Sequence, residues 1–298
     1  GRTEGKYEGR FYNDSDVYKW IEAAAYSLAL FPDSELEAEV DRVVELVEAA
    51  QQSDGYVNTY FTLNEPDKRW TNLSFMHELY CGGHLIQAAI AYRRATGHRR
   101  LFEVALRFAN CTYDVFGPAG RDGYPGHQEI ELALVALYRE SRDERFLELA
   151  RLFVERRGEE PSLFAREFSR LREIAGARVE GYPDFYDHVR ALFLDSDGNY
   201  DGAYAQDHLP VRRQSEVVGH AVRAMYHYCG VTDVAMETED SELRRRLEEL
   251  WQDMRGRKSY VTGGIGSSYQ NEGFTKPFDL PNRTAYSETC ASVGSIMW

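Results

Sequence analysis

Apolar residues recur along most of the chain with the period of an α-helix. Within residues 101–117 they follow the i, i+3, i+4, i+7, i+8 spacing of a helix that buries one face. The same spacing marks residues 16–31, 36–51, 146–158 and 243–254. Alternation typical of β-strands is confined to short stretches near 55–61 and 260–264. The pattern therefore predicts an all-α protein.

A repeat of about 45 residues, the length of a two-helix repeat, lies beneath these helices. Tyr92, Tyr138 and Tyr228 each end one predicted helix shortly before the next begins, and they are spaced 46 and 90 residues apart. The first helix of each unit is apolar nearly all round and the second is charged, so we expect an inner and an outer helix. Repeated hairpins of this kind form either an open α-solenoid or a closed (α/α) barrel.

Inner helices are predicted near 16–31, 76–95, 127–140 and 214–230, with a fifth beginning near Tyr286. A six-hairpin barrel, (α/α)6, needs one more inner helix beyond Trp298. The stretch 158–213 interrupts the period with Gly, Pro, Tyr and Asp, which predicts an elaborated loop region with a helix of its own. We expect residues 1–298 to form a single barrel domain that is incomplete at its C-terminal end.

Composition and charge narrow the functional class. The formal net charge is −14, and no cluster of Lys and Arg stands apart from acidic residues, which disfavours nucleic acid and anionic membranes as partners. No apolar run approaches the length of a membrane-spanning helix. The four cysteines form no C-x-x-C pair and the N-terminal segment has no apolar signal region, so a cytoplasmic location is expected. The sequence leaves an oligomer possible.

Histidines precede or begin the predicted inner helices in three repeat units. His84 and His220 occupy the same repeat position, since each lies eight residues before its repeat tyrosine, and His127 falls one helical turn earlier. Inner helices of a barrel direct one end toward the central cavity, so His84, His127 and His220 are candidates to meet there. Three interpretations remain open: histidines that close helix starts, a three-histidine metal site, or donors and acceptors for sugar hydroxyls. Tyr12, Trp20, Tyr56 and Tyr204 are candidate aromatic partners for sugar rings.

The segment 260–298 carries two carboxylates and a thiol, Glu272, Glu288 and Cys290. A general acid needs a raised pKa near neutral pH, and Glu288 is predicted to supply the negative charge that raises the pKa of Glu272. Glu288 and Cys290 could give one oxygen and one sulfur ligand to a single ion, whereas a zinc site normally has four ligands.

Several long segments resemble glycoside hydrolase family 127, whose best-known activity is that of a β-L-arabinofuranosidase. They include HELYCGGHLIQAAIAYRRATG, GHQEIELALVALY, RRQSEVVGHAVRAMY, YVTGGIGS and LPNRTAYSETCAS. The resemblance implies an (α/α)6 catalytic barrel followed by β-rich domains, a glycan or glycoside substrate, and hydrolysis with retention. It also implies a zinc site of one Glu and three Cys, of which one is the nucleophile. Glu272 matches the family's acid/base, Glu288 and Cys290 match two zinc ligands, and His84, His127 and His220 match residues lining the sugar subsite.

The chain departs from this pattern at one point. The family places the nucleophile in a downstream Cys-Cys pair, and this chain has none. We therefore expect an incomplete zinc site and no hydrolysis by this span alone. Two alternatives stay open: another six-hairpin sugar enzyme, such as an epimerase or an unsaturated-uronide hydrolase, and a non-catalytic helical-repeat protein that binds a partner.

Overall fold

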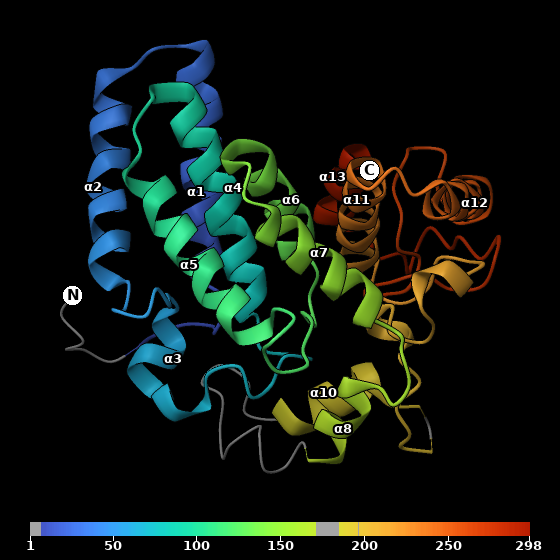
Figure 1. The fold of residues 1–298 in the computed structure, drawn as a ribbon. Coiled ribbons are helices and arrows are strands. Elements are labelled where there is room, and N and C mark those ends of the chain that lie inside the picture. The colour runs from blue at the N-terminus through green and yellow to red at the C-terminus, as the bar shows by residue number, and fades with distance from the viewer. Residues whose placement is uncertain (1–6, 171–184, 196) are drawn as a thin grey trace.

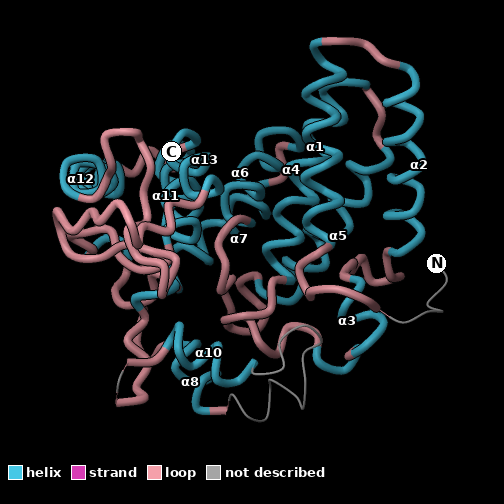
Figure 2. The backbone as a smooth tube through the Cα atoms, turned by 180° about the vertical axis from the view of Figure 1, so that it is seen from behind, coloured by secondary structure: helices cyan, strands magenta, loops and turns pink. Residues whose placement is uncertain are grey.

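The computed structural model describes residues 7–170, 185–195 and 197–298, and this part of the chain is helical (Figure 1). β-Structure in it is limited to isolated bridges, as the tube in Figure 2 shows from behind. The first helices are α1 (Asp14–Leu30), α2 (Ser34–Ala50), α3 (Thr59–Asn64), α4 (Glu78–Thr96), α5 (Arg100–Phe116), α6 (Ile130–Ser141) and α7 (Glu144–Arg156). The later helices are α8 (Leu163–Ser169), α10 (Phe185–Phe193), α11 (Ala221–Glu237), α12 (Ser241–Arg257) and α13 (Thr289–Met297). Short 3₁₀ turns are η1 (Pro66–Lys68), η2 (Ala203–Ala205) and η3 (Val211–Arg213).

The long helices form two rows. In the inner row α1 packs on α4, α4 on α6, α6 on α11 and α11 on α13, while the outer helices α2, α5, α7 and α12 each pack on the inner helix before them. Figure 1 shows the progression from α1 and α2 at one side to α12 and α13 at the other. The predicted hairpins and their inner and outer order are confirmed, and the arrangement is that of the six-hairpin barrel class.

Burial follows the predicted division between the rows. Fourteen residues of α4 are buried, on all sides of the helix, whereas α2 buries only Val40, Val44 and Val47. Two glycines let α4 approach its neighbours closely. A Cβ at Gly82 would lie 2.0 Å from the Phe108 ring, and one at Gly83 would lie 2.6 Å from the side chain of Glu129. The lack of a Cβ at these two glycines therefore sets the spacing between α4 and its neighbours, because protein interiors are close-packed.

Helix starts differ between the rows. The outer helices α2, α7 and α12 begin at Asp33, Asp143 and Asp240, whose carboxylates accept hydrogen bonds from backbone N–H groups of the first turn. The inner helices α4, α6, α11 and α13 instead begin after four other residues: His77, Glu129, His220 and Glu288. Chemically versatile residues thus occupy the N-terminal ends of the inner helices.

The segments near 55–61 and 158–213 form short helices and loops. The stretch near 55–61 is not strand-like, because Asn58 accepts a hydrogen bond from the Phe61 N–H and starts α3. The region 158–213 contains α8, α10, η2 and η3. This agrees with the predicted elaborated loop region carrying a helix, although residues 171–184 lie outside the described part.

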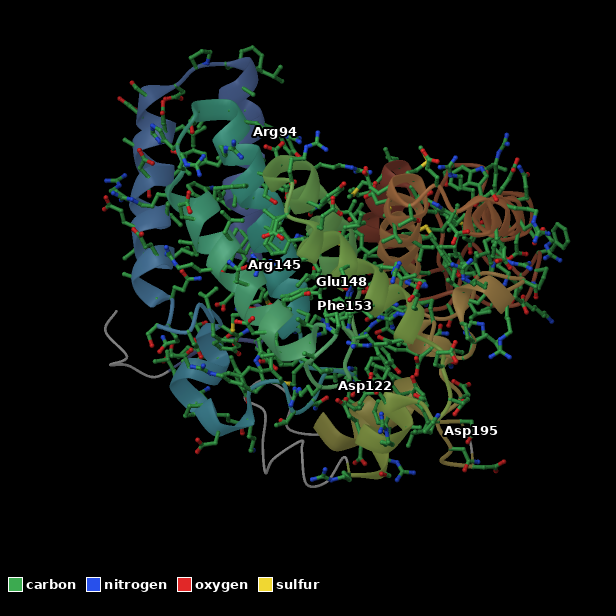
Figure 3. All side chains as sticks on the ribbon, in the orientation of Figure 1. Arg94, Asp122, Arg145, Glu148, Phe153 and Asp195 are labelled. Carbon is green, nitrogen blue, oxygen red and sulfur yellow. The ribbon has the colours of Figure 1, made fainter. Side chains whose placement is uncertain are left out.

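Polar side chains join the outer helices α5 and α7. Tyr113 of α5 donates a hydrogen bond to Glu148 of α7 at 2.6 Å, and the guanidinium of Arg145 lies 5.6 Å from the Tyr113 ring. Figure 3 labels Arg145 and Glu148 on α7. Among the helices that the structure describes, none is long and apolar enough to span a membrane.

Candidate active site

A cavity of about 500 Å³ opens at the N-terminal ends of the inner helices. Its walls come from α1, the starts of α4, α11 and α13, the segment before α6, helix α10, and the loop that carries Glu272. Five residues predicted from the sequence for the site or its sugar contacts line it, among others: His127, His220, Glu272, Glu288 and Cys290. The fold therefore brings the C-terminal cluster and two of the three predicted histidines into one cavity.

Glu272 is placed by a tight turn. Ser268 and Gly273 exchange two backbone hydrogen bonds at 2.9 and 3.1 Å, and the Glu272 carbonyl accepts from the Ala221 N–H at 3.1 Å. Gly273 lies so close to Gly219 that a Cβ would meet the Gly219 carbonyl oxygen at 2.0 Å. Glu272 itself has a φ of +50°, a left-handed conformation that costs a non-glycine residue about 1 kcal/mol. Such a conformation at a cavity wall is typical of a functional position.

The nearest partner of Glu272 is His220. The Nδ1 of His220 accepts a hydrogen bond from the Arg223 N–H at 3.2 Å, so the proton of a neutral imidazole lies on Nε2. Nε2 then donates to Oε2 of Glu272 at 3.1 Å. The start of α11 thus fixes both the tautomer of His220 and the orientation of the Glu272 carboxylate.

The pKa of Glu272 departs from our expectation. The hydrogen bond from His220 lowers the pKa of Glu272 below its usual 4.5, and this effect outweighs burial, which acts in the opposite direction. Tyr286 adds a further hydrogen bond that lowers the pKa of Glu272. The prediction that Glu288 would raise this pKa is wrong, because the net shift of the Glu272 pKa is downward. Glu272 is therefore ionised at neutral pH.

Three imidazole rings form a row along the cavity wall. The rings of His77 and His127 lie 5.2 Å apart and those of His127 and His220 lie 5.8 Å apart, between centroids. His77 donates from Nδ1 to the Phe75 carbonyl at 2.5 Å, and His127 donates from Nδ1 to the Gln128 carbonyl at 2.8 Å. Burial lowers the pKa of both rings, so both are neutral and keep Nε2 as an acceptor.

His84 lies elsewhere. It is almost fully buried on α4, seven residues beyond His77, and it is not among the residues that line the cavity. Its ring packs against Tyr80 at a centroid distance of 4.5 Å, and Tyr80 separates it from His127. Nδ1 of His84 lies 3.5 Å from Oε1 of the fully buried Glu129. The repeat alignment placed His84 with His220, but the cavity position on α4 belongs to His77.

Glu288 and Cys290 lie together at the start of α13. Burial raises the pKa of the Cys290 thiol to about 11, with a further contribution from the hydrogen bond and charge of Glu288. One carboxylate oxygen of Glu288 also lies within 4.8 Å of ligand atoms from His220 and Glu272. The side chains of Glu288 and Cys290 are hydrogen-bonded to each other, and a carboxylate oxygen and a thiolate sulfur are both donors that zinc accepts. These residues fit a zinc ion that takes two ligands, Glu288 and Cys290, from this chain.

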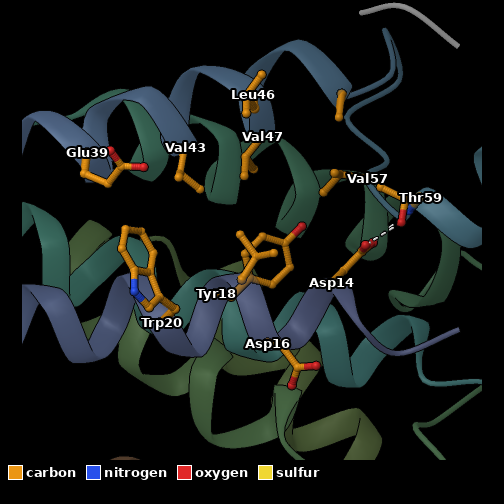
Figure 4. Close-up of a pocket in the computed structure, with 12 residues that line it drawn as sticks. Asp14, Asp16, Tyr18, Trp20, Glu39, Val43, Leu46, Val47, Val57 and Thr59 are labelled. Carbon is orange, nitrogen blue, oxygen red and sulfur yellow. Dashed lines mark hydrogen bonds between the residues drawn. The ribbon is translucent and has the colours of Figure 1, made fainter. Parts of the chain in front are cut away.

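Of the aromatic residues and cysteines considered from the sequence, some line the cavity and others lie elsewhere in the fold. Tyr12 and Tyr204 line the cavity. Tyr56 is buried and donates to Glu78 at 2.5 Å. Trp20 lines a separate apolar groove of about 650 Å³ between α1 and α2 (Figure 4). Cys81, Cys111 and Cys229 are buried, as expected for structural cysteines.

Sequence reasoning missed several cavity residues, among them His77, Arg223 and Tyr286. A signal for His77 was present, because it directly precedes its inner helix as His220 does. Arg223 lies one turn into α11, and Tyr286 lies two residues before Glu288. Neither shows a pattern that separates it from ordinary helix or loop residues.

Comparison with known proteins identifies the family. The sequence profile of the β-L-arabinofuranosidase GH127 catalytic domain matches residues 2–298. The chain belongs to glycoside hydrolase family 127. It is 40% identical over 304 aligned residues to a non-reducing end β-L-arabinofuranosidase of Bifidobacterium longum subsp. longum. That alignment covers all of this chain and 44% of the relative, so the chain spans less than half of the length of the relative.

Solved structures agree with the family 127 assignment. A GH127 β-L-arabinofuranosidase from Geobacillus stearothermophilus T6 superposes with a TM-score of 0.88 at 44% identity, over 99% of this chain and 44% of that one. A second GH127 β-arabinofuranosidase gives a TM-score of 0.82 at 35% identity, over 99% and 42%. A D-mannose isomerase shares only the fold, with a TM-score of 0.54 at 13% identity, over 95% and 69%. Membership of family 127 favours a glycosidase over the epimerase, the unsaturated-uronide hydrolase and the non-catalytic helical-repeat protein.

Proposed function

We propose that this chain is the catalytic-barrel portion of a glycosidase that releases β-L-arabinofuranose, or a closely related sugar, from glycans with retention of configuration. The relatives named as β-L-arabinofuranosidases support the substrate class. The observation that carries the proposal is the pairing of Glu272 with a neutral His220, 3.1 Å apart, in a cavity that also contains Glu288 and Cys290.

Glu272 acts as the acid/base. As acid it gives a proton to the glycosidic oxygen while the bond from that oxygen to the anomeric carbon breaks, and as base it takes a proton from the water that releases the sugar. The free protein holds Glu272 ionised, the form needed for the second step. A bound sugar displaces water from the cavity, and this desolvation raises the carboxyl pKa toward the form needed for the first step.

The histidine row binds the sugar in this proposal. Nε2 of His77 and of His127 accepts from sugar hydroxyls, because their Nδ1 protons are held by backbone carbonyls. His220 holds the Glu272 carboxylate in place. In this proposal the carboxylate then faces the glycosidic oxygen of the bound substrate. Aromatic rings of Tyr12 and Tyr204 provide apolar surface for the sugar face.

Glu288 and Cys290 would hold zinc, which keeps thiol ligands ionised at neutral pH when it is bound. The nucleophile in this proposal is a cysteine outside residues 1–298. Among the chain's own cysteines three are buried, and Cys290 serves as a ligand.

Glu272→Gln in the full-length enzyme tests the proposal. The substitution keeps the size and the hydrogen bond from His220 but cannot deliver a proton. General acid/base catalysis contributes about 10²- to 10⁴-fold, so kcat/KM for an unactivated β-L-arabinofuranosyl disaccharide should fall by that factor. A p-nitrophenyl glycoside, which needs less acid assistance, should be cleaved in the first step nearly as before, and azide should restore turnover with a β-configured azide product. Wild-type turnover of the disaccharide by Glu272→Gln would refute the assignment, and an inverted first product by NMR would refute retention.

A further inference from the structure

Arg223 is a buried cation at the cavity that forms no ion pair with a carboxylate of the described residues. Its side chain is 2% exposed, lines the cavity and donates to the Gly126 carbonyl, while its Nε has no hydrogen-bond partner. None of the carboxylates that the structure describes lies within the 4.0 Å of an ion pair with it. A buried charge without a counter-ion is costly.

A second buried arginine, Arg157, has a carboxylate within ion-pair distance. Arg157 is 1% exposed, lies 3.5 Å from the carboxylate of Glu131 and donates to the Ala205 carbonyl at 2.9 Å. Arg157 does not line the cavity. Nε of each arginine is without a hydrogen-bond partner. Arg157 has a carboxylate within ion-pair distance, whereas Arg223 interacts with the charge of Glu272 only from beyond that distance.

The position of Arg223 on its helix adds to the cost. It is the third residue of α11, in the first turn, where the helix dipole disfavours a positive charge. Burial, helix position and the lack of an ion pair within the described residues all oppose a cation here. A cation that is kept in a cavity against these costs indicates that it interacts with a ligand.

The surroundings restrict the chemistry of that ligand. The guanidinium carbon lies 5.0 Å from the Tyr204 ring centre and 5.4 Å from that of Phe193, so aromatic rings flank the guanidinium. Tyr204 and the Gly126 carbonyl bond to part of its N–H edge, and Nε has no partner. Glu272 and Glu288 line the same cavity and would repel a carboxylate or phosphate. A neutral polyol, whose hydroxyl oxygens accept hydrogen bonds, satisfies both conditions.

We propose that Arg223 is a specificity-determining residue that donates a charge-assisted hydrogen bond to one hydroxyl oxygen of the sugar bound beside Glu272. This rests on the proposed glycosidase function and adds a residue to it. Hydrogen bonds to charged groups are stronger than neutral ones. Loss of this one should reduce kcat/KM by about 10- to 100-fold.

The test combines residue and substrate changes in the full-length enzyme. Arg223→Met is assayed on a β-L-arabinofuranoside and on its 2-, 3- and 5-deoxy analogues, with Arg157→Met as the matched control. For Arg223→Met we expect kcat/KM to fall about 10- to 100-fold on the parent arabinofuranoside and on the two deoxy analogues that keep the bound hydroxyl. On the analogue that lacks this hydroxyl, kcat/KM should fall by less than about 3-fold. Arg157→Met should change kcat/KM by one common factor on all four. An equal loss for Arg223→Met on all four substrates would overturn the proposal.

Two further results distinguish a failure of this inference from misfolding of the variant and from a failure of the proposed glycosidase function. If Arg223→Met does not fold, Arg223→Lys, which keeps the charge but loses the fork of donors, is measured in the same series and judged by the same criterion. If the wild-type enzyme hydrolyses no arabinofuranoside, the proposed function fails and this inference with it. If the wild type is active and the deoxy analogues respond uniformly, this inference alone fails.

Discussion

Replacing Glu78 by glutamine should remove a strong pH dependence of stability. The Glu78 carboxyl group is fully buried at the start of α4, where it accepts from the Tyr56 hydroxyl at 2.5 Å and from the Trp70 N–H at 2.9 Å. Burial outweighs these hydrogen bonds and raises the pKa of Glu78 from 4.5 to about 8. Below pH 4.5 the group is protonated in both the folded and the unfolded chain. Between pH 4.5 and about 8 the unfolded chain releases the proton and the folded chain keeps it, so the free energy of unfolding falls as pH rises.

The size of the effect follows from the same two values. The gap between 4.5 and about 8, at about 1.4 kcal/mol per pH unit, amounts to at most about 5 kcal/mol. Glu167, whose pKa burial raises to about 7, and the buried histidines also make stability depend on pH. These contributions are shared by the parent and the variant, so they cancel in the difference between the two proteins.

Urea unfolding of the parent and Glu78→Gln at pH 5, 6, 7 and 8 measures that difference. The variant is expected to gain stability relative to the parent by several kcal/mol between pH 5 and pH 8. The surface substitution Glu248→Gln serves as the control and should show a nearly constant difference from the parent. A difference for Glu78→Gln that stays flat within about 1 kcal/mol over this range would refute the argument that burial controls this carboxyl group.

Two other perturbations probe the packing and the metal ligands. Gly83→Ala should destabilise the chain by about 1–3 kcal/mol in urea unfolding, because the new Cβ would meet Glu129 Cγ at 2.6 Å and the Ile130 nitrogen at 2.9 Å. Gly256→Ala on α12, where no atom lies within 4 Å, should instead stabilise it by about 0.5–1 kcal/mol, and equal effects would contradict the close approach of α4 and α6. The 298-residue polypeptide should bind zinc weakly in calorimetric titration, and Cys290→Ser should weaken binding further. Tight stoichiometric zinc, or no effect of Cys290→Ser, would contradict the two-ligand site.

The helical architecture could be predicted from the chain because its signals are local. The 3.6-residue period, the tyrosines at repeat ends and the contrast between apolar and charged helices determine inner and outer rows without tertiary information. Glu272, Glu288 and Cys290 were also found from the sequence, since they cluster within one short segment and reach the cavity together.

Spacing alone could not decide which of two histidines reaches the cavity. His77, which directly precedes α4, and His84, within α4, lie two helical turns apart, and the repeat alignment favoured His84. The packing of α4 decides between them, because Tyr80 lies between His84 and the cavity residue His127 while His77 stands at the helix start. The depth of a residue along a helix depends on the neighbouring helices, which the local sequence does not specify.

The order of residues along the chain was enough to predict an all-α repeat of hairpins, the similarity to family 127, and the carboxylates and thiol of the C-terminal segment. The protonation chemistry depends on the tertiary structure. The turn that carries Glu272 packs against the start of α11, where His220 lowers the pKa of the carboxyl group. The same packing buries Arg223 at the cavity, where it forms no ion pair with a carboxylate that the structure describes. Both effects depend on distances between segments far apart in the chain, because burial and charge act through space.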